Sequence, residues 1–139
     1  MKIAIRYFTR SGHTQKLAEA IAEKIHIEAE TISLPLSEKV DILFLGCSYY
    51  AFDMDKEVKS FIAENKDKIG EIVCFGTSAM MKSMKKPMKK VADMYGVKLS
   101  DKEFHCKGEF KFANKGRPNA DDLNQAALFS EKVVKANEQ

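Results

Sequence analysis

The stretch YFTRSGHT near the N-terminus places three hydroxyl side chains around one glycine. Thr9, Ser11 and Thr14 can each donate a hydrogen bond, and Gly12 lets a bound group approach the backbone closely. An apolar segment precedes the stretch and an amphipathic one follows it, which predicts a turn from strand to helix. A helix N-terminus offers unpaired N–H groups and the positive end of the helix dipole. Together these features predict a phosphate-binding loop, to which Arg10 adds one positive charge.

Other phosphate-binding motifs do not fit this stretch. A P-loop needs a second glycine followed by lysine, and a dinucleotide fingerprint needs three glycines, whereas only Gly12 is present here. A simpler alternative is that Ser11 only caps the helix. Three hydroxyls so close together at one turn favour the phosphate hypothesis over the cap.

The rest of the chain alternates between strand and helix patterns. Short apolar runs predict strands at residues 3–8, 27–34, 40–45, 71–75 and 104–106. Helical spacing predicts helices at residues 14–25, 55–65, 87–95 and 119–134, the third ended by Gly96 and the fourth begun by Asn119. Such alternation indicates an α/β fold, a parallel sheet with helices on both faces. Ligands bind such sheets beyond the carboxyl ends of the strands, where the hydroxyl loop falls.

Composition limits the class of protein. The chain has 139 residues, 45% hydrophobic and 31% charged, which fits one globular domain spanning residues 1–139. It has no apolar run of about 20 residues and no secretion signal, so we expect no membrane span. Cys47, Cys74 and Cys106 form no C-x-x-C pair, and free thiols fit a cytoplasmic location. The net charge of +3 is mild and does not indicate nucleic acid as a partner.

Three segments resemble the flavodoxin family. The first stretch is similar to the family signature, an aromatic residue followed by T/S-x-T/S-G-x-T, and Thr9, Ser11, Gly12 and Thr14 match it position by position. LGCSYY, after the third strand, resembles the loop that carries an aromatic residue onto the flavin. CFGTS, after the fourth, resembles the second flavin loop. The segments occur in the family's order, and the chain length is similar to that of the short-chain form.

The resemblance implies a flavodoxin-like three-layer αβα sandwich with five parallel strands in the order 2-1-3-4-5. It also implies one FMN, bound non-covalently, with no catalytic residue and no metal ligand. The cofactor-binding residues that it implies are Thr9, Arg10, Ser11, Gly12, His13 and Thr14 in the first loop, Ser48, Tyr49, Tyr50, Ala51 and Phe52 in the second, and Gly76, Thr77, Ser78 and Ala79 in the third.

The sequence departs from the family in its third loop and in its charge. That loop lacks the usual aromatic residue, and Met80 or Met81 could cover the ring edge or face the core instead. Five lysines follow within residues 82–90: Lys82, Lys85, Lys86, Lys89 and Lys90. They form a solvated face or, beside the cofactor, a surface that steers an acidic partner or a nucleotide. The long segment from Lys107 to Pro118 is either a surface connection or a cover for the site.

Four functions stay open at this point. The favoured one is an electron-transfer flavoprotein that shuttles electrons between a reductase and an acceptor protein. The second is an FMN-dependent NAD(P)H oxidoreductase, in which Arg10 and the lysines hold the nucleotide phosphates. The third is an activator subunit, like the flavodoxin-like protein that serves manganese ribonucleotide reductase. The fourth is a flavin-free scaffold, although the paired acids of response regulators are absent after the first strand.

Overall fold

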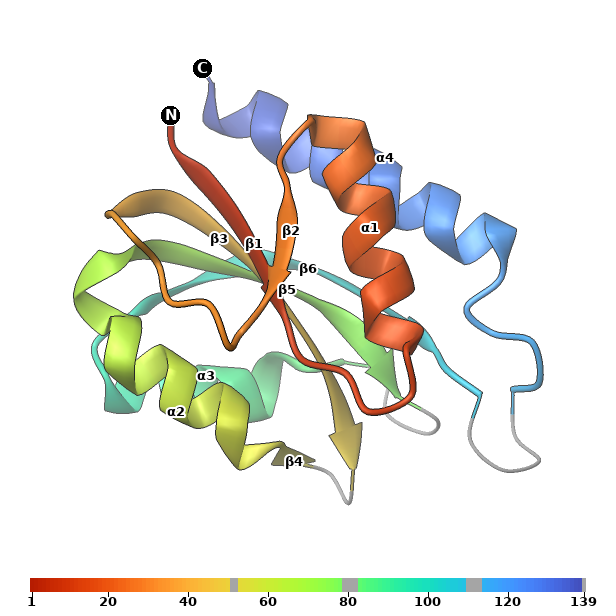
Figure 1. Cartoon of the computed structure of the whole chain (residues 1–139), viewed down its shortest axis with the longest axis horizontal. Coiled ribbons are helices and arrows are strands. Elements are labelled where there is room, and N and C mark those ends of the chain that lie inside the picture. Colours follow the sequence, from red (N-terminus) through yellow and green to blue (C-terminus); the bar gives the residue numbers. More distant parts are fainter. Residues whose placement is uncertain (51–52, 79–82, 110–113, 139) are drawn as a thin grey trace.

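A parallel β-sheet forms the middle layer of the protein (Figure 1). The computed structural model describes residues 1–50, 53–78, 83–109 and 114–138. The parallel strands are β1 (Ile3–Tyr7), β2 (Ala29–Thr31), β3 (Val40–Tyr50), β5 (Ile69–Ser78) and β6 (Lys98–Lys107). Their order across the sheet is β2-β1-β3-β5-β6, which confirms the predicted 2-1-3-4-5 arrangement.

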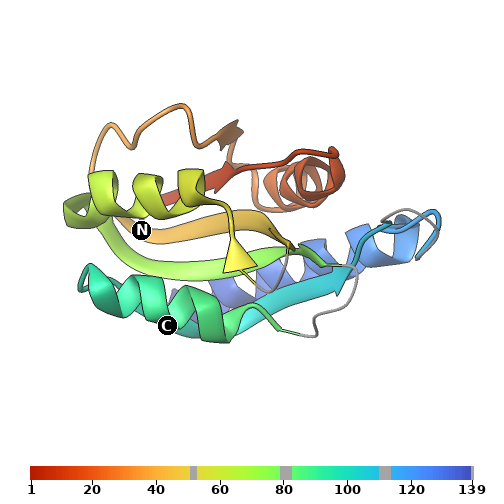
Figure 2. The same ribbon diagram turned by 90° about the horizontal axis from the view of Figure 1, so that it is seen from below.

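Helices cover both faces of this sheet. They are α1 (His13–Ile25), α2 (Lys56–Asn65), α3 (Lys85–Met94) and α4 (Ala120–Asn137), with a short 3-10 helix, η1 (Lys66–Lys68). Helices α1 and α4 lie together on one face, and α2 and α3 lie on the other (Figures 1 and 2). The three-layer αβα sandwich is therefore confirmed. Within the described ranges, no helix is both long enough and apolar enough to span a membrane.

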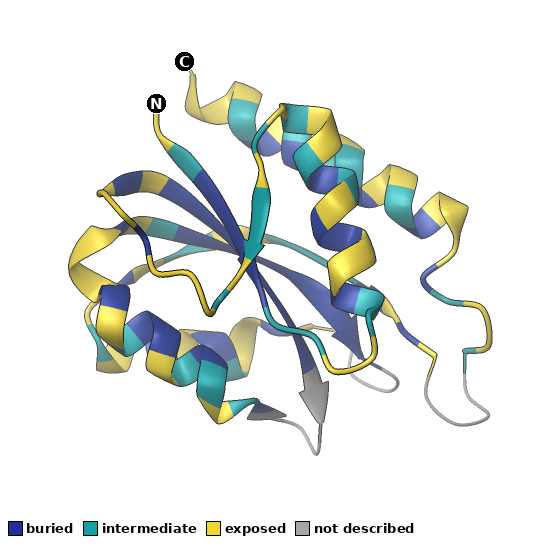
Figure 3. Cartoon of the chain, in the orientation of Figure 1, coloured by how far each residue is buried: buried dark blue, intermediate teal, exposed yellow. Residues whose placement is uncertain are grey.

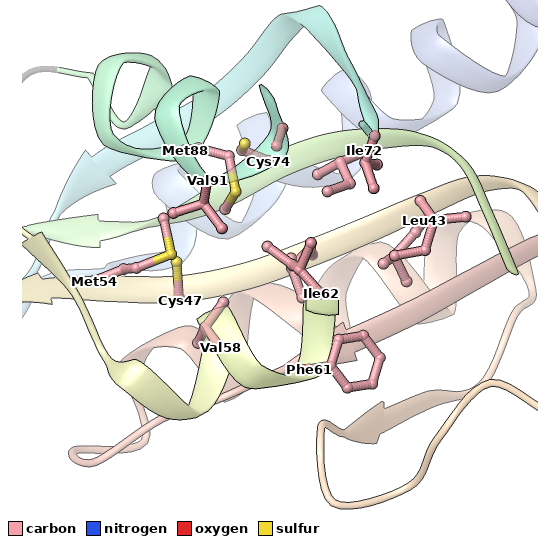
Figure 4. Packing of buried hydrophobic residues seen from close by; sticks show 14 of the residues in the cluster. Leu43, Cys47, Met54, Val58, Phe61, Ile62, Ile72, Cys74, Met88 and Val91 are labelled. Atoms are coloured by element: carbon pink, nitrogen blue, oxygen red, sulfur yellow. The ribbon is translucent and has the colours of Figure 1, made fainter. Parts of the chain in front are cut away.

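Each face of the sheet has its own hydrophobic core. On one face, Val58 and Ile62 of α2 and Met88 of α3 pack against the side chains of β3 and β5 (Figure 4). On the other, Leu17 and Ile21 of α1 contact residues that include Phe44 of β3 and Phe75 of β5. The near-continuous apolar runs of β3 and β5 follow from this double coverage (Figure 3).

The helix ends follow the sequence signals. Gly96 follows Tyr95, the C-cap residue of α3, and has a φ of 69°, which glycine adopts without strain, so its role as a terminator is confirmed. The Asn119 side chain accepts a hydrogen bond from Asp122 N at 3.0 Å, and the Asp122 side chain accepts one from Asn119 N at 2.8 Å. This reciprocal pair is a capping box, and it confirms Asn119 as the start of α4.

The strand bounds differ from the prediction in the centre and at the edges of the sheet. Strands β3 and β5 run on to Tyr50 and Ser78, so LGCSYY and CFGTS belong to the strands rather than following them. Strand β6 spans ten residues rather than residues 104–106, and β2 spans three rather than residues 27–34. Both are edge strands with half-exposed side chains, so the apolar pattern marks them poorly. A two-residue strand that the sequence did not predict, β4 (Asp53–Met54), pairs antiparallel with the end of β3.

Candidate functional site

The carboxyl ends of β1, β3 and β5 meet at one edge of the sheet. Tyr7 pairs with Gly46, and Ser48 pairs with Thr77 in the parallel ladders. Phe8 N extends the first pairing by donating to Gly46 O at 3.0 Å. The chain leaves β1 toward β2 on one side while β3 lies on the other, so this edge is the topological switch point. The structure thus brings the three loops of the predicted site together.

The first loop turns sharply into α1 at Gly12. This residue is the N-cap of α1 and has a φ of 89°, a conformation that strains other residues. Thr9 Oγ1 accepts a hydrogen bond from Gly12 N at 2.8 Å and so fixes the turn. Ser11 is exposed and precedes the N-cap, and its Oγ accepts a long hydrogen bond of 3.5 Å from His13 N, the first backbone N–H of α1.

The start of α1 keeps donors available. In the described part of the chain, no hydrogen bond uses the backbone N–H of Ser11, Thr14 or Gln15. These are the groups that a helix N-terminus offers to an anion, together with the positive end of its dipole. Open space surrounds the α-carbon of Gly12, where a Cβ would meet no atom within 4 Å. The loop can therefore accept a compact anionic group.

Three buried hydroxyls link the loops beneath this turn. Thr14 Oγ1 lies 2.8 Å from Ser48 Oγ, which lies 3.0 Å from Thr77 Oγ1. Thr14 is 0% exposed, and Ser48 and Thr77 are also buried. We call these three residues the hydroxyl triad. The Thr14 hydroxyl, which the resemblance assigns to the cofactor, is hydrogen-bonded to Ser48 and so ties α1 to β3 and, through Ser48, to β5.

Two glycines allow the close packing at this edge. A Cβ on Gly46 would overlap the Phe75 ring and lie 2.9 Å from Thr14 Cγ2. A Cβ on Gly76 would overlap the carbonyl oxygen of Cys47. Gly76, which the resemblance places among the cofactor-binding residues, therefore has a packing role in this structure.

Arg10 pairs with an acid that the sequence reasoning missed. Its guanidinium Nε lies 3.1 Å from Asp55 Oδ1, and its Nη2 contacts the same oxygen. The guanidinium also lies 5.9 Å from the centre of the Phe8 ring, which is a cation–π distance. Asp55 is the N-cap residue of α2, and its other oxygen, Oδ2, is buried without a hydrogen bond to the described residues. The sequence did contain a signal for Asp55, because an aspartate at the start of a predicted helix, and shortly after the aromatic loop, is a typical N-cap residue near the site.

The end of β6 also reaches the site. Gly108 N donates to Ser78 O at 3.2 Å, and Ser78 is buried. A Cβ on Gly108 would lie 3.0 Å from Thr77 Cβ and 3.3 Å from His13 Nδ1. His13, at the first position of α1, is half-buried and lies beside Gly108. No motif in the sequence marked Gly108.

The two tyrosines predicted to contact the flavin lie at the end of β3. Tyr49 and Tyr50 end β3, where their backbone pairs with β4. Cys47 is buried within β3 and does not belong to the loop. The predicted residues that lie outside the described ranges are Ala51, Phe52, Ala79, Met80, Met81 and Lys82, together with residues 110–113 of the segment from Lys107 to Pro118.

The three cysteines are free and buried. Burial raises the pKa of the Cys74 thiol well above its ordinary value, and it raises that of Cys106 to about 12. Both thiols stay protonated near neutral pH, so neither is an activated nucleophile. Among the described residues, no cluster of histidine, cysteine or acidic side chains could hold a metal ion.

The sequence and the structure of the chain are both similar to those of known proteins. A family model described as "Flavodoxin domain" matches residues 4–116. A flavodoxin from the domain Archaea superposes with a TM-score of 0.78 at 17% identity, covering 100% of both chains. A short-chain flavodoxin associated with a bacterial microcompartment superposes with a TM-score of 0.72 at 17% identity, covering 98% of this chain and 99% of the other.

A flavoprotein from Lactobacillus acidophilus, solved in complex with FMN, gives a TM-score of 0.63 at 18% identity, covering 75% of this chain and 92% of the other. No curated protein sequence matches the chain. At such identities the solved structures establish the fold, and the family model extends over most of the sequence. The chain belongs to the flavodoxin family.

Proposed function

We propose that residues 1–139 form one domain that binds FMN non-covalently and carries electrons between a reductase and an acceptor protein. The supporting observation is the open N-terminus of α1 at the switch point, flanked by the ends of β3 and β5. Family membership supports the same reading. Bound FMN would supply the redox chemistry, and the chain would bind and orient it.

The donor set fits a phosphate group. We assign phosphate binding to the first loop, through backbone N–H groups around Gly12 and the outward hydroxyl of Ser11. Thr9 shapes that loop through its bond to Gly12 N. Thr14 acts from beneath, because its hydroxyl already belongs to the hydroxyl triad. Arg10 would add charge only if it turned away from Asp55.

The other two loops would flank the flavin ring. We propose that the ring lies between the end of β3 and the end of β5, which are neighbours in the sheet. The residues assigned to it are Ser48, Tyr49, Tyr50, Ala51 and Phe52 on one side and Gly76, Thr77, Ser78 and Ala79 on the other. The free cysteines fit the reducing cytoplasm, where we expect the protein to act.

A visible absorption spectrum tests this function. The purified protein, reconstituted with FMN and freed of excess ligand, should keep the two visible bands of oxidised flavin. Loss of all flavin on gel filtration would contradict FMN binding. Anaerobic mixing with NADPH alone should leave those bands unchanged, because a carrier needs a separate reductase. Rapid bleaching by NADPH would instead favour an FMN-dependent NAD(P)H oxidoreductase.

A further inference from the structure

Helix α3 buries one side and presents lysines on the other. Met88, Val91 and Ala92 pack into the core beneath it. Four lysines of the helix are exposed, and we call them the α3 lysine face: Lys85, Lys86, Lys89 and Lys90. Lys82 precedes the helix and lies outside the described residues, so the predicted row of lysines begins at Lys85.

Helix α3 as a whole carries a charge equal to the net charge of the protein. The helix holds four lysines and one acid, Asp93, which gives +3. The complete chain has 23 basic and 20 acidic residues, which also gives +3. All other residues therefore sum to zero. Charge that is concentrated on one helix produces a directed field, whereas dispersed charge does not.

The arrangement is unfavourable for the helix itself. Lys85 and Lys86 occupy the first turn, which has no acid, so they face the positive end of the helix dipole. Lys89 and Lys90 each follow another lysine by four residues, a repulsive spacing. Of the four lysines, only Lys89 forms an ion pair among the described residues, with Asp93 at 2.7 Å. The lysines of this helix thus repel one another and the helix dipole, and contacts within the protein do little to offset that repulsion.

One acid does approach the start of α3. Glu103 of β6 accepts hydrogen bonds from the Ser83 hydroxyl and, at 3.2 Å, from Met84 N. Its two oxygens cap the helix and form no ion pair with the lysines of the face. The charges of Lys85, Lys86 and Lys90 therefore stay available to an external group.

The face begins beside the candidate site. Strand β5 ends at Ser78 on the ligand edge, and α3 starts at Lys85, only a short segment later (Figures 1 and 2). Lys107, paired with Ser78 at the end of β6, is also exposed. A macromolecule seated on α3 would therefore lie next to anything bound at the ends of β3 and β5.

We propose that the α3 lysine face docks an acidic surface of the redox partner protein. This inference rests on the proposed function, because the docked partner would exchange electrons with the bound flavin. Lysine ammonium groups are mobile and strongly hydrated, and on a convex helix they diverge. Such groups suit long-range attraction to an extended acidic surface better than close coordination of one nucleotide phosphate.

A charge-matched pair of variants tests the docking face. The test variant replaces three lysines of the face: Lys85→Gln, Lys86→Gln and Lys90→Gln. The control variant replaces three exposed lysines outside α3: Lys39→Gln just before β3, Lys66→Gln in η1 and Lys132→Gln in α4. Both variants change the net charge from +3 to 0, so they differ only in where the charge is removed.

The probe is a strongly acidic [2Fe–2S] ferredoxin. In stopped-flow mixing, the reduced ferredoxin loses one electron and the bound flavin gains it. At low ionic strength we expect the test variant to react about tenfold more slowly than the parent, and the control variant less than about twofold. The difference should disappear at high salt, because screening removes the attraction. Equal slowing of both variants, or none, would overturn the proposal.

A binding measurement separates this proposal from FMN binding. Fluorescence anisotropy of labelled, oxidised ferredoxin reports docking whether or not flavin is present. If the protein holds no FMN but the test variant alone loses ferredoxin binding, the docking face stands and the proposed function fails. If flavin binds normally and anisotropy is the same for both variants, the docking face fails. Binding to vesicles of anionic phospholipid, with none to ferredoxin, would also overturn it.

Discussion

At the residue scale, the hydroxyl groups near the first loop have two roles, one in the loop itself and one in the packing beneath it. Thr9 and Ser11 shape or line the loop, whereas Thr14 joins Ser48 and Thr77 underneath it. The sequence could show only that hydroxyls cluster around Gly12. It could not show that Thr14 points inward, because its partners come from strands 34 and 63 residues further along the chain.

Ser48→Ala should destabilise the protein, because it breaks both links of the hydroxyl triad and leaves two buried hydroxyls without this partner. We expect the free energy of unfolding to fall by about 1–3 kcal/mol, measured by urea denaturation. Ser33→Ala is the control, since it removes a hydroxyl pair with Thr31 that is exposed. An equal fall in the free energy of unfolding for the two substitutions would show that the hydroxyl triad contributes no more to stability than an exposed hydroxyl pair.

Thr9→Ala should weaken FMN binding more than riboflavin binding. The substitution removes the acceptor for Gly12 N, so the loop that we assign to the phosphate loses its fixed turn. We expect a loss of about tenfold for FMN, measured by fluorescence titration, which corresponds to about 1.4 kcal/mol. Thr9→Ser keeps the hydroxyl and should restore affinity. If riboflavin weakens as much as FMN, this loop does not hold the phosphate.

At the element scale, the sequence predicted the strands and helices that are covered on both sides or clearly amphipathic. Strands β3 and β5 are near-continuous apolar runs, and α1 shows regular spacing, so their existence was predictable. Strand β4 was not, because two residues carry no periodicity and depend on pairing with β3. The Arg10–Asp55 ion pair likewise depends on how α2 packs beside the first loop.

Asp122, near the N-terminus of α4, should make the free energy of unfolding depend on pH. The hydrogen bond from the Arg117 guanidinium lowers the pKa of Asp122 in the folded protein, and the bond from Asn119 N adds to it. A lowered folded pKa means that the stabilisation is present above the ordinary carboxyl pKa. It is lost as the pH falls through the folded value.

Asp122→Asn should therefore reduce the free energy of unfolding by about 1–2 kcal/mol at pH 7. The parent and the variant should converge once the pH falls below the lowered folded pKa of Asp122, where its carboxyl is protonated in both the folded and the unfolded state. Urea denaturation across this range measures the effect. Asp121→Asn, in the same helical turn but exposed, should change little. A constant gap between parent and Asp122→Asn at all pH values would contradict the assignment.

At the scale of the whole molecule, FMN should raise the stability of the fold by mass action. A ligand at one hundred times its dissociation constant adds about 2.7 kcal/mol when it binds only the folded state. Differential scanning fluorimetry should show a thermal midpoint that rises with FMN concentration. Riboflavin at the same concentration should raise it less, because it lacks the phosphate. Equal shifts for both ligands would argue against the phosphate loop.

Because helices cover β3 on both faces, we expect it to open to solvent on a much slower timescale than the edges of the molecule. Leu43 and Leu45 face one hydrophobic core, Phe44 faces the other, and β1 and β5 bond to β3 on both sides. The amide protons of this strand should therefore exchange with solvent only when the whole protein unfolds. Those of β2, a three-residue edge strand, and of the loop before Gly12 should exchange far sooner. A cofactor could then enter and leave many times within the life of one folded molecule, while the middle of the sheet keeps its original protons.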